Sequence, residues 1–297
     1  MGPILTLFSR FSLPRYRRNR NSGRRSPAAL RLARWAALAW LLVAAPGAVV
    51  EGAPAAGVEG APLEGALHGF PAMRSLDGKK LADGDFAQWI EGGRLHIRIL
   101  YEFGEGRRVE ERAAFRQSPE LVQEEWSLRE MRGGELYRHF EVDFRSGAAS
   151  AKKREEGGLR EWTGKLETPS GRAFAGFGFT MALKALRERL MRGERVELRA
   201  AAFTPKPRLV EVELRHGGLD RMRMGGRLLR GDRFIVHAKI PWIATLFVDA
   251  PDHRIWLTNP APAGFLRWEG PLAEPGDPVI RVDLLPGGES GAAEPIR

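Results

Sequence analysis

Three residues in the C-terminal part of the chain carry side chains that could bind a metal ion. Asp249, Asp252 and His253 form the pattern D-x-x-D-H, and carboxylate and imidazole groups are common metal ligands. Pro251 lies among them, however, and aspartate is favoured in proline-containing turns for local reasons. We interpret the cluster first as a turn and second as a weak candidate metal site.

The sequence offers no nucleophile for covalent catalysis. The chain contains no cysteine, and no serine stands in a G-x-S-x-G pattern, which is the usual setting of a hydrolase nucleophile. Gly176 and Gly178 form a G-x-G pair without the third glycine or the strand-to-helix context of a nucleotide-binding loop. We therefore predict no catalytic residue and no cofactor, and an enzymatic activity is not favoured. The interleaved Phe174, Phe177 and Phe179 either gate the mouth of a cavity or belong to an ordinary core.

Charged residues on a predicted apolar face are the second group that could do chemistry. Paired carboxylates near an arginine can bind a polar head group or perform acid–base chemistry. The predicted strand pairing places Glu111 opposite Trp126, with Glu124 one diagonal step away. The alternative is that these charges lie at the rim of the sheet or form an internal ion pair without a ligand. The candidate ligand-binding residues are Glu111, Glu124, Trp126, Arg138, Phe140 and Phe179.

Four antiparallel strands are predicted between Leu95 and Phe144, and they position these residues. Apolar and polar residues alternate there, which is the period of a half-buried strand. Loop length decides whether odd residues pair with odd or with even ones. The loops at 104–106 and 117–120 keep the apolar residues on one face, and the loop at 132–134 does so only with a glycine bulge. We expect this sheet to curl around the rest of the protein or around a ligand.

The most convincing helix of the chain is predicted at Thr180–Arg192. Its apolar residues, spaced four, three and four apart from Phe179 to Leu190, form a single stripe. Gly193 stands where a helix C-cap belongs. We expect the apolar stripe to pack onto the apolar face of the sheet.

The remaining chain is predicted to form one β-rich domain at residues 86–286. Residues 51–85, rich in Gly, Ala and Pro, are predicted as a flexible leader, and residues 287–297 as a disordered tail. After the helix, strand-like segments occur at 195–203, 208–215, 222–230, 233–240, 254–257, 265–268 and 279–285, with a short buried helix at 241–248.

The N-terminal segment has the layout of a secretory signal peptide. Residues 1–50 contain nine arginines and no acidic residue, and an uncharged Ala- and Leu-rich run extends from Trp35 to Val50. A basic region, a short apolar run and small residues are typical of an export signal. We expect cleavage between Ala45 and Ala56 and a periplasmic or secreted protein, with an uncleaved anchor as the lesser alternative.

Export also changes the charge of the protein that remains. Removing the nine arginines from the 47 basic residues of the chain leaves 38 against 37 acidic residues. A nearly neutral protein has no electrostatic footprint for nucleic acid. We therefore predict no nucleic-acid partner and at most a peripheral association with a membrane.

The order of elements resembles a known group of proteins. An export signal, antiparallel strands, one central helix ending in Arg-Gly-Glu at Arg192–Glu194, and further strands resemble exported bacterial domains of unknown function. Those domains share an open half-barrel with the lipoprotein-localisation carriers. The resemblance implies a concave face that can hold acyl chains, and it transfers no individual residue.

These observations predict a mainly β protein, in which a curved antiparallel sheet forms an open half-barrel with one central helix on its concave face. The leading functional hypothesis is a noncatalytic carrier of an apolar or amphiphilic ligand, such as a lipid, in the cell envelope. The second is an envelope scaffold whose concavity is filled by its own side chains. A metal-assisted enzyme at Asp249, Asp252 and His253 ranks third.

Overall fold

The computed structural model describes residue 58 and residues 63–224, 226–239, 251–284 and 294–295. The predicted signal peptide, the predicted helix at 241–248 and Asp249 lie outside the described residues. Among the described residues, no helix has the length and apolar character needed to cross a membrane.

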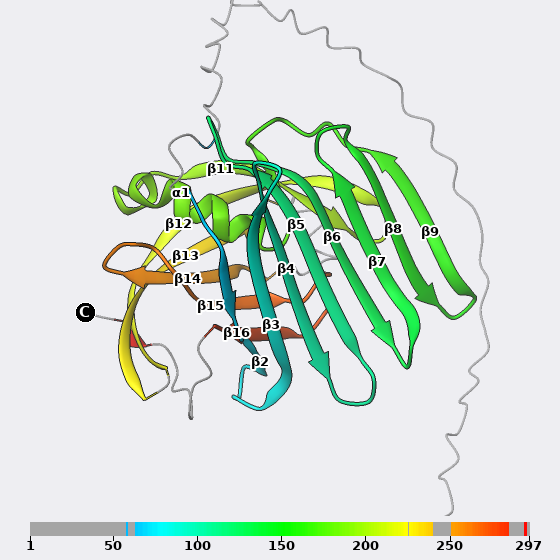
Figure 1. Ribbon diagram of the computed structural model, residues 1–297, viewed down its shortest axis with the longest axis horizontal. Coiled ribbons are helices and arrows are strands. Elements are labelled where there is room, and N and C mark those ends of the chain that lie inside the picture. The colour runs from blue at the N-terminus through cyan, green and yellow to red at the C-terminus, as the bar shows by residue number, and fades with distance from the viewer. Residues whose placement is uncertain (1–57, 59–62, 225, 240–250, 285–293, 296–297) are drawn as a thin grey trace, which may run out of the picture. The chain divides into compact units, whose positions relative to one another are not determined.

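The first part of the described chain forms nine strands in an antiparallel arrangement (Figure 1). They are β1 (Leu67–Gly69), β2 (Ala72–Ser75), β3 (Lys80–Glu91), β4 (Arg94–Phe103), β5 (Arg108–Arg116), β6 (Val122–Arg132), β7 (Glu135–Asp143), β8 (Ala148–Glu155) and β9 (Gly158–Lys165). Each strand from β2 to β8 pairs with the next along the chain, and β1 pairs with the end of β3 beside β2.

The second part of the chain adds the helix and eight further strands. They are β10 (Ala173–Phe174), α1 (Gly178–Met191), β11 (Val196–Phe203), β12 (Pro207–Met224), β13 (Arg227–Ala238), β14 (His253–Asn259), β15 (Phe265–Pro271), β16 (Val279–Asp283) and β17 (Glu294–Pro295). β10 and β11 pair in parallel, and β11 to β16 form a second antiparallel run.

One pairing, between β16 and β2, joins the two runs into a single sheet. The sheet curves so strongly that β12 comes to lie near β8 and β9, yet no ladder of hydrogen bonds between described residues closes it. The predicted fold class, a mainly β protein with an open, curved antiparallel sheet and one central helix, is therefore confirmed.

The curvature follows from the amphipathic strands. On one face, Leu95, Ile97 and Ile99 of β4 are buried and belong to the same hydrophobic core as Leu198 of β11 and Phe234 of β13. On the other face, charged residues pair across strands, as Arg98 does with Glu110 at 2.6 Å. A sheet with one apolar face must bury that face, and curling against its own second half achieves this.

The predicted register of the first meander is confirmed for β4 and β5, where Ile97 pairs with Ala113. The predicted three-residue loop with a glycine bulge at 132–134 is wrong. Gly133 and Gly134 form a two-residue turn at φ values of 56° and 83°, which glycine adopts without strain. The bulge lies further along the hairpin, between Glu130 and Met131, and it returns the apolar residues of β7 to the inner face.

Two predicted boundaries are corrected by the sheet. The leader predicted at 51–85 contains β1, β2 and the start of β3, and Val58 is buried in the core. The Gly-, Ala- and Pro-rich composition of this segment is typical of a flexible leader, so it did not indicate the short strands. In the predicted tail, Glu294 and Pro295 form β17, which pairs with β12.

The predicted strands at 208–215, 222–230 and 233–240 are replaced by one long hairpin of β12 and β13. The sequence His216-Gly217-Gly218 resembles a turn but is a β-bulge inside β12, where Gly218 has φ 115°. The chain reverses only after Met224. Glycine pairs mark both turns and bulges, so the sequence alone did not separate the two.

The predicted helix is confirmed within two residues at its start. Its stripe from Phe179 to Leu190 is buried in the core shared by both runs of strands. After the helix, Gly193 has φ 89° and its N–H donates to the carbonyl of Leu190 at 3.0 Å. Figure 1 shows α1 at one end of the sheet, next to β11 and β12 and away from β8 and β9.

A buried ionic cluster connects the two runs of strands. Arg138 of β7, with a side chain only 2% exposed, contacts Glu274 at 3.0 Å and Asp277 at 2.9 Å, two residues in the loop between β15 and β16. It also forms an ion pair with the fully buried Glu130 at 2.8 Å. Lys153 of β8 holds Glu274 at 2.7 Å. We call these five residues the Arg138 cluster.

Arg138 favours the charged form of Asp277, although this carboxylate is partly buried. Burial alone would raise the pKa of Asp277, but the hydrogen bond and positive charge of Arg138 outweigh this effect and lower it. The carboxylate of Asp277 also accepts hydrogen bonds from the backbone N–H groups of Ala273 and Glu274 at 3.0 and 3.1 Å. The loop is thus folded on itself and tied to the opposite wall.

Replacing Arg138 tests whether this tie stabilises the fold. In Arg138→Met, buried carboxylates lose their counter-charge, and we expect the free energy of unfolding to fall by about 3 kcal/mol or more. The control is Arg145→Met, which removes an ion pair with Glu125 from a side chain that is 44% exposed, and should lose less than about 1 kcal/mol. Urea unfolding measures both, and equal losses would contradict a stabilising role for the cluster.

Candidate ligand-binding cavity

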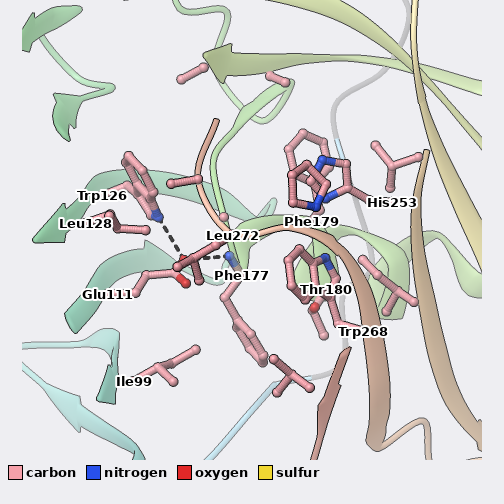
Figure 2. Close-up of a pocket in the computed structure, with 18 of the residues that line it drawn as sticks. Ile99, Glu111, Trp126, Leu128, Phe177, Phe179, Thr180, His253, Trp268 and Leu272 are labelled. Atoms are coloured by element: carbon pink, nitrogen blue, oxygen red, sulfur yellow. Dashed lines mark hydrogen bonds between the residues drawn. The ribbon is translucent and has the colours of Figure 1, made fainter. Parts of the chain in front are cut away.

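A cavity of about 1040 Å³ lies inside the curved sheet. Its walls come from both runs of strands, from α1 and from the loop between β15 and β16, as Ile99, Leu128, Phe179, Trp268 and Leu272 illustrate (Figure 2). Cavities of this size and apolar character are suited to small molecules. The side chains of the described residues therefore leave part of the inner face unfilled.

Glu111 is the most unusual residue of the cavity wall, because it is a carboxyl group among apolar and aromatic neighbours. Its Oε1 accepts a hydrogen bond from the indole Nε1 of Trp126 at 2.8 Å and another from the backbone N–H of Phe177 at 2.7 Å, both drawn in Figure 2. Three segments, β5, β6 and the loop before α1, therefore meet at one carboxyl oxygen.

The predicted strand pairing at Glu111 is wrong by two residues. Glu111 lies opposite Leu128, and Trp126 lies opposite Ala113. A β-bulge between Ala114 and Phe115 shifts the register within this hairpin, and the sequence gives no glycine or proline to mark it. Trp126 reaches Glu111 diagonally through its long side chain.

The two glycines before α1 allow the loop to approach the sheet. A Cβ atom on Gly176 would lie 1.9 Å from Glu111 Oε1, and one on Gly178 would lie 2.2 Å from the side-chain oxygen of Gln123. Gln123, itself buried, accepts from the N–H of Ala175 at 2.7 Å and donates to its carbonyl at 3.2 Å. The G-x-G pair thus serves close packing rather than phosphate binding.

Burial raises the pKa of Glu111, although the hydrogen bonds from Phe177 and Trp126 act in the opposite direction. Burial also raises the pKa of the nearby Tyr101 hydroxyl, and the negative charge of Glu111 adds to this effect. Both groups line the cavity. The two hydrogen bonds therefore compensate an ionised Glu111 only in part.

His253 contributes a second titratable group to the cavity wall. Burial lowers the pKa of its imidazole to about 4, despite the opposing charge of Asp252. The ring lies 5.7 Å from that of Trp268, and Figure 2 shows both on the opposite side of the cavity from Glu111. At neutral pH His253 is an uncharged part of the wall.

The structure separates the predicted ligand-binding residues into two groups. Glu111, Trp126 and Phe179 line the cavity. Glu124 instead pairs with Arg94 at 2.7 Å, outside the cavity lining. The alternative of an internal ion pair therefore describes Glu124.

The other two candidates are also structural. Arg138 belongs to the Arg138 cluster, and Phe140 stacks on Phe203 with ring centroids 4.9 Å apart. Neither is among the residues that line the cavity. The predicted grouping of Glu111, Glu124 and Arg138 is wrong, because the bulge in β5 and the distant partners of Arg138 direct the three side chains to different surroundings.

The candidate metal site remains a prediction, since Asp249 lies outside the described residues. Asp252 is engaged by His237, whose Nδ1 lies 2.7 Å from its carboxylate, while His253 lines the cavity. Within the described part of the chain, no three His, Cys, Asp or Glu residues are grouped as a metal ion would require.

Sequence reasoning missed the wall formed by β15 and the following loop. Trp268 and Leu272 lie more than 140 residues after Trp126, in segments assigned only as a strand and a connection. The alternation around Trp268 could have indicated an inward side chain. Nothing local could have indicated which wall it faces.

Comparisons with known proteins place few constraints on this chain. No protein-family model matches it, and no curated protein matches it. Among solved structures, it is similar to a β-barrel-like protein of a domain of unknown function, DUF1849, from Brucella abortus. That match has 8% sequence identity and a TM-score of 0.34, and it covers 79% of this chain and 100% of the other. The predicted resemblance to lipoprotein-localisation carriers stays a prediction.

Gly176→Ala tests the contact between the loop and Glu111. The added methyl group requires both a strained backbone at φ 50° and displacement of the Glu111 carboxyl group. Gly193→Ala is a matched control, because Gly193 has φ 89° but no atom within 4 Å of the added carbon. We expect about 1–2 kcal/mol of destabilisation in the control and clearly more in Gly176→Ala, with altered Trp126 emission. Equal losses of stability in the two variants would show that the close contact between Gly176 and Glu111 does not affect stability.

The lowered pKa of His253 predicts a pH-dependent stability. The unfolded chain binds a proton at His253 near its ordinary pKa of about 6.5, whereas the folded protein does so only near pH 4. The contribution is thus complete above pH 6.5 and is lost as the pH falls toward 4, by up to about 3 kcal/mol. Glu111, with its raised pKa, acts in the opposite direction as the pH falls.

The pH prediction is checked by urea unfolding at pH 7 and pH 4.5. His253→Gln should lose less stability on acidification than the wild type, while His237→Gln, at an exposed imidazole, should retain the wild-type loss. A wild-type pH response in His253→Gln would contradict the assignment.

Proposed function

We propose that this protein is exported to the cell envelope and binds an apolar or amphiphilic molecule inside its curved sheet. The cavity of about 1040 Å³ carries this proposal. Most of its lining is apolar. A ligand that removes this apolar surface from water lowers the free energy, which favours binding. The basic and apolar N-terminal segment supports the export part of the proposal.

The charged lining residues support an amphiphilic as well as a purely apolar ligand. Arg208, Glu211 and Lys239 line the cavity and are exposed, whereas Leu128 and Phe179 are buried. These three charges therefore lie at the solvent-exposed margin of the cavity, and apolar side chains lie deeper. A molecule with one polar and one apolar end matches this gradient.

The cavity favours a carrier over a scaffold with a self-filled core. Protein interiors are close-packed, and unfilled spaces larger than a few water molecules are uncommon. A scaffold would gain stability by filling this space with larger side chains. The retained space is consistent with a role in binding.

Native mass spectrometry of the protein, purified from the exported fraction without detergent, tests the proposal. We expect a discrete additional mass that solvent extraction removes, and uptake of a neutral naphthalene-based fluorescent probe by the extracted protein. A single unliganded mass together with no uptake of the probe would favour the scaffold.

A cavity-filling substitution locates the bound molecule. Ala200 lines the cavity, and the neighbouring Arg199 is exposed on the same strand. Ala200→Trp should abolish the additional mass or weaken probe binding at least about tenfold, since the indole occupies ligand space. Arg199→Trp should bind like the wild type. Unchanged binding in both variants would place the ligand elsewhere.

A further inference from the structure

Glu111 differs from the other carboxylates of the cavity wall in its electrostatic surroundings. Among the described lining residues, Glu211 has Arg199 at 3.5 Å and Glu274 has Lys153 at 2.7 Å. Glu111 has no cationic group within ion-pair distance in the part of the chain that the structure describes. Glu111 is therefore a carboxyl group of the cavity wall without a cationic partner among the described residues.

The cations of the cavity wall are engaged elsewhere. Lys184 of α1 pairs with Glu64, and Lys239 pairs with Glu197. Arg208 is exposed and donates to the backbone carbonyl of Thr204 at 2.7 Å. These contacts hold the lining cations away from Glu111, so that the protein itself does not neutralise this carboxylate.

Hydrogen bonds hold the carboxyl group of Glu111 in a defined position. Oε1 accepts both of its hydrogen bonds. Oε2 accepts no hydrogen bond from the described residues, and it is not among the polar atoms that are completely enclosed without a partner. The absence of a side chain at Gly176 creates the space in which Oε1 meets the N–H of Phe177. One oxygen is thus fixed by the protein, and the other is left for a ligand.

Several aromatic residues line the cavity together with Glu111. Trp126, Tyr101, Phe86 and Phe177 line the same part of the cavity, and the rings of Phe86 and Phe177 are 5.3 Å apart. Aromatic faces attract cations, most strongly where water is excluded. A carboxylate combined with aromatic faces therefore complements an ammonium group better than a carboxylate or phosphate head group.

We propose that the cavity binds a hydrophobic amine whose ammonium group pairs with Oε2 of Glu111. This inference rests on the proposed function and specifies its ligand class. The amine supplies the counter-charge that the fold lacks, and its hydrocarbon part fills the apolar space. A neutral alcohol of the same length gains only the apolar contacts, and a fatty acid brings a like charge to Glu111.

The test compares three ligands of equal chain length, decylamine, decanol and decanoate, below their micelle-forming concentrations. Each displaces the neutral fluorescent probe from the solvent-extracted protein. We expect the wild type to bind decylamine at least about thirtyfold more tightly than decanol, which is the scale of a buried charge pair, and decanoate most weakly. Binding of decanol or decanoate as tight as that of decylamine would overturn the inference.

Two variants assign the preference to one carboxyl group. Glu111→Gln keeps the shape and the acceptor oxygen but removes the charge, so it should lose at least about thirtyfold in decylamine affinity and leave decanol affinity unchanged. Glu124→Gln is the matched control, because this buried carboxyl group lies outside the cavity lining and already has Arg94 as its partner, and it should keep the wild-type preference. An undiminished preference for amine in Glu111→Gln would overturn the inference.

The two proposals fail in different ways. If the probe binds but decylamine is not preferred, the protein is a carrier with another ligand class. If neither the probe nor any of the three ligands binds, the proposed function and this inference both fail. Should Glu111→Gln not fold, the comparison of the three ligands on the wild type still decides.

Discussion

The contact between Arg138 and the loop after β15 is the interaction on which the interior depends. The sheet has one apolar face and is not closed by strand pairing between described residues, so tertiary contacts must hold its walls in place. Glu274 and Asp277 reach Arg138 across 136 and 139 residues of sequence. Because the guanidinium is buried, its attraction to these carboxylates is weakly screened by solvent. The same loop contributes Leu272 to the cavity wall, so the contact that holds the loop against β7 also helps to define the interior space.

Glycine plays a corresponding part at the other side of the cavity. Gly176 and Gly178 let the segment before α1 press against β5 and β6, where Glu111 and Gln123 receive its backbone groups. The start of the helix is thereby fixed by side chains of the sheet. The buried stripe of α1 then packs into the core shared by both runs of strands. The close approach of the loop to β5 and β6 therefore sets the position of the Glu111 carboxyl group and the position at which α1 begins.

Much of the local structure follows from the sequence alone, and its failures share a physical cause. Alternating residues predict β4 to β7, and spacing predicts α1, because both depend on periods within a single element. The hairpin of β6 and β7 keeps its apolar face although the bulge lies at Glu130 rather than at Gly133, because one inserted residue restores the register wherever it stands. The bulge at Ala114 has no such signal, and it separates Glu111 from the predicted partner. Contacts such as Arg138 with Glu274 join distant segments, and only the folded topology specifies them.

The three charges predicted on the inner face show why burial by itself does not identify a site. Arg138 and Glu124 are buried with opposite charges beside them, and in such pairs attraction offsets part of the desolvation penalty. Glu111 is half-buried with hydrogen-bond donors but without a cation among the described residues, so the charge of its ionised form is compensated only in part. A residue needed only to hold the loop could accept the same two hydrogen bonds as glutamine, at lower electrostatic cost. The difference between these surroundings, rather than the depth of burial, distinguishes a carboxyl group available to a ligand from one that serves the fold.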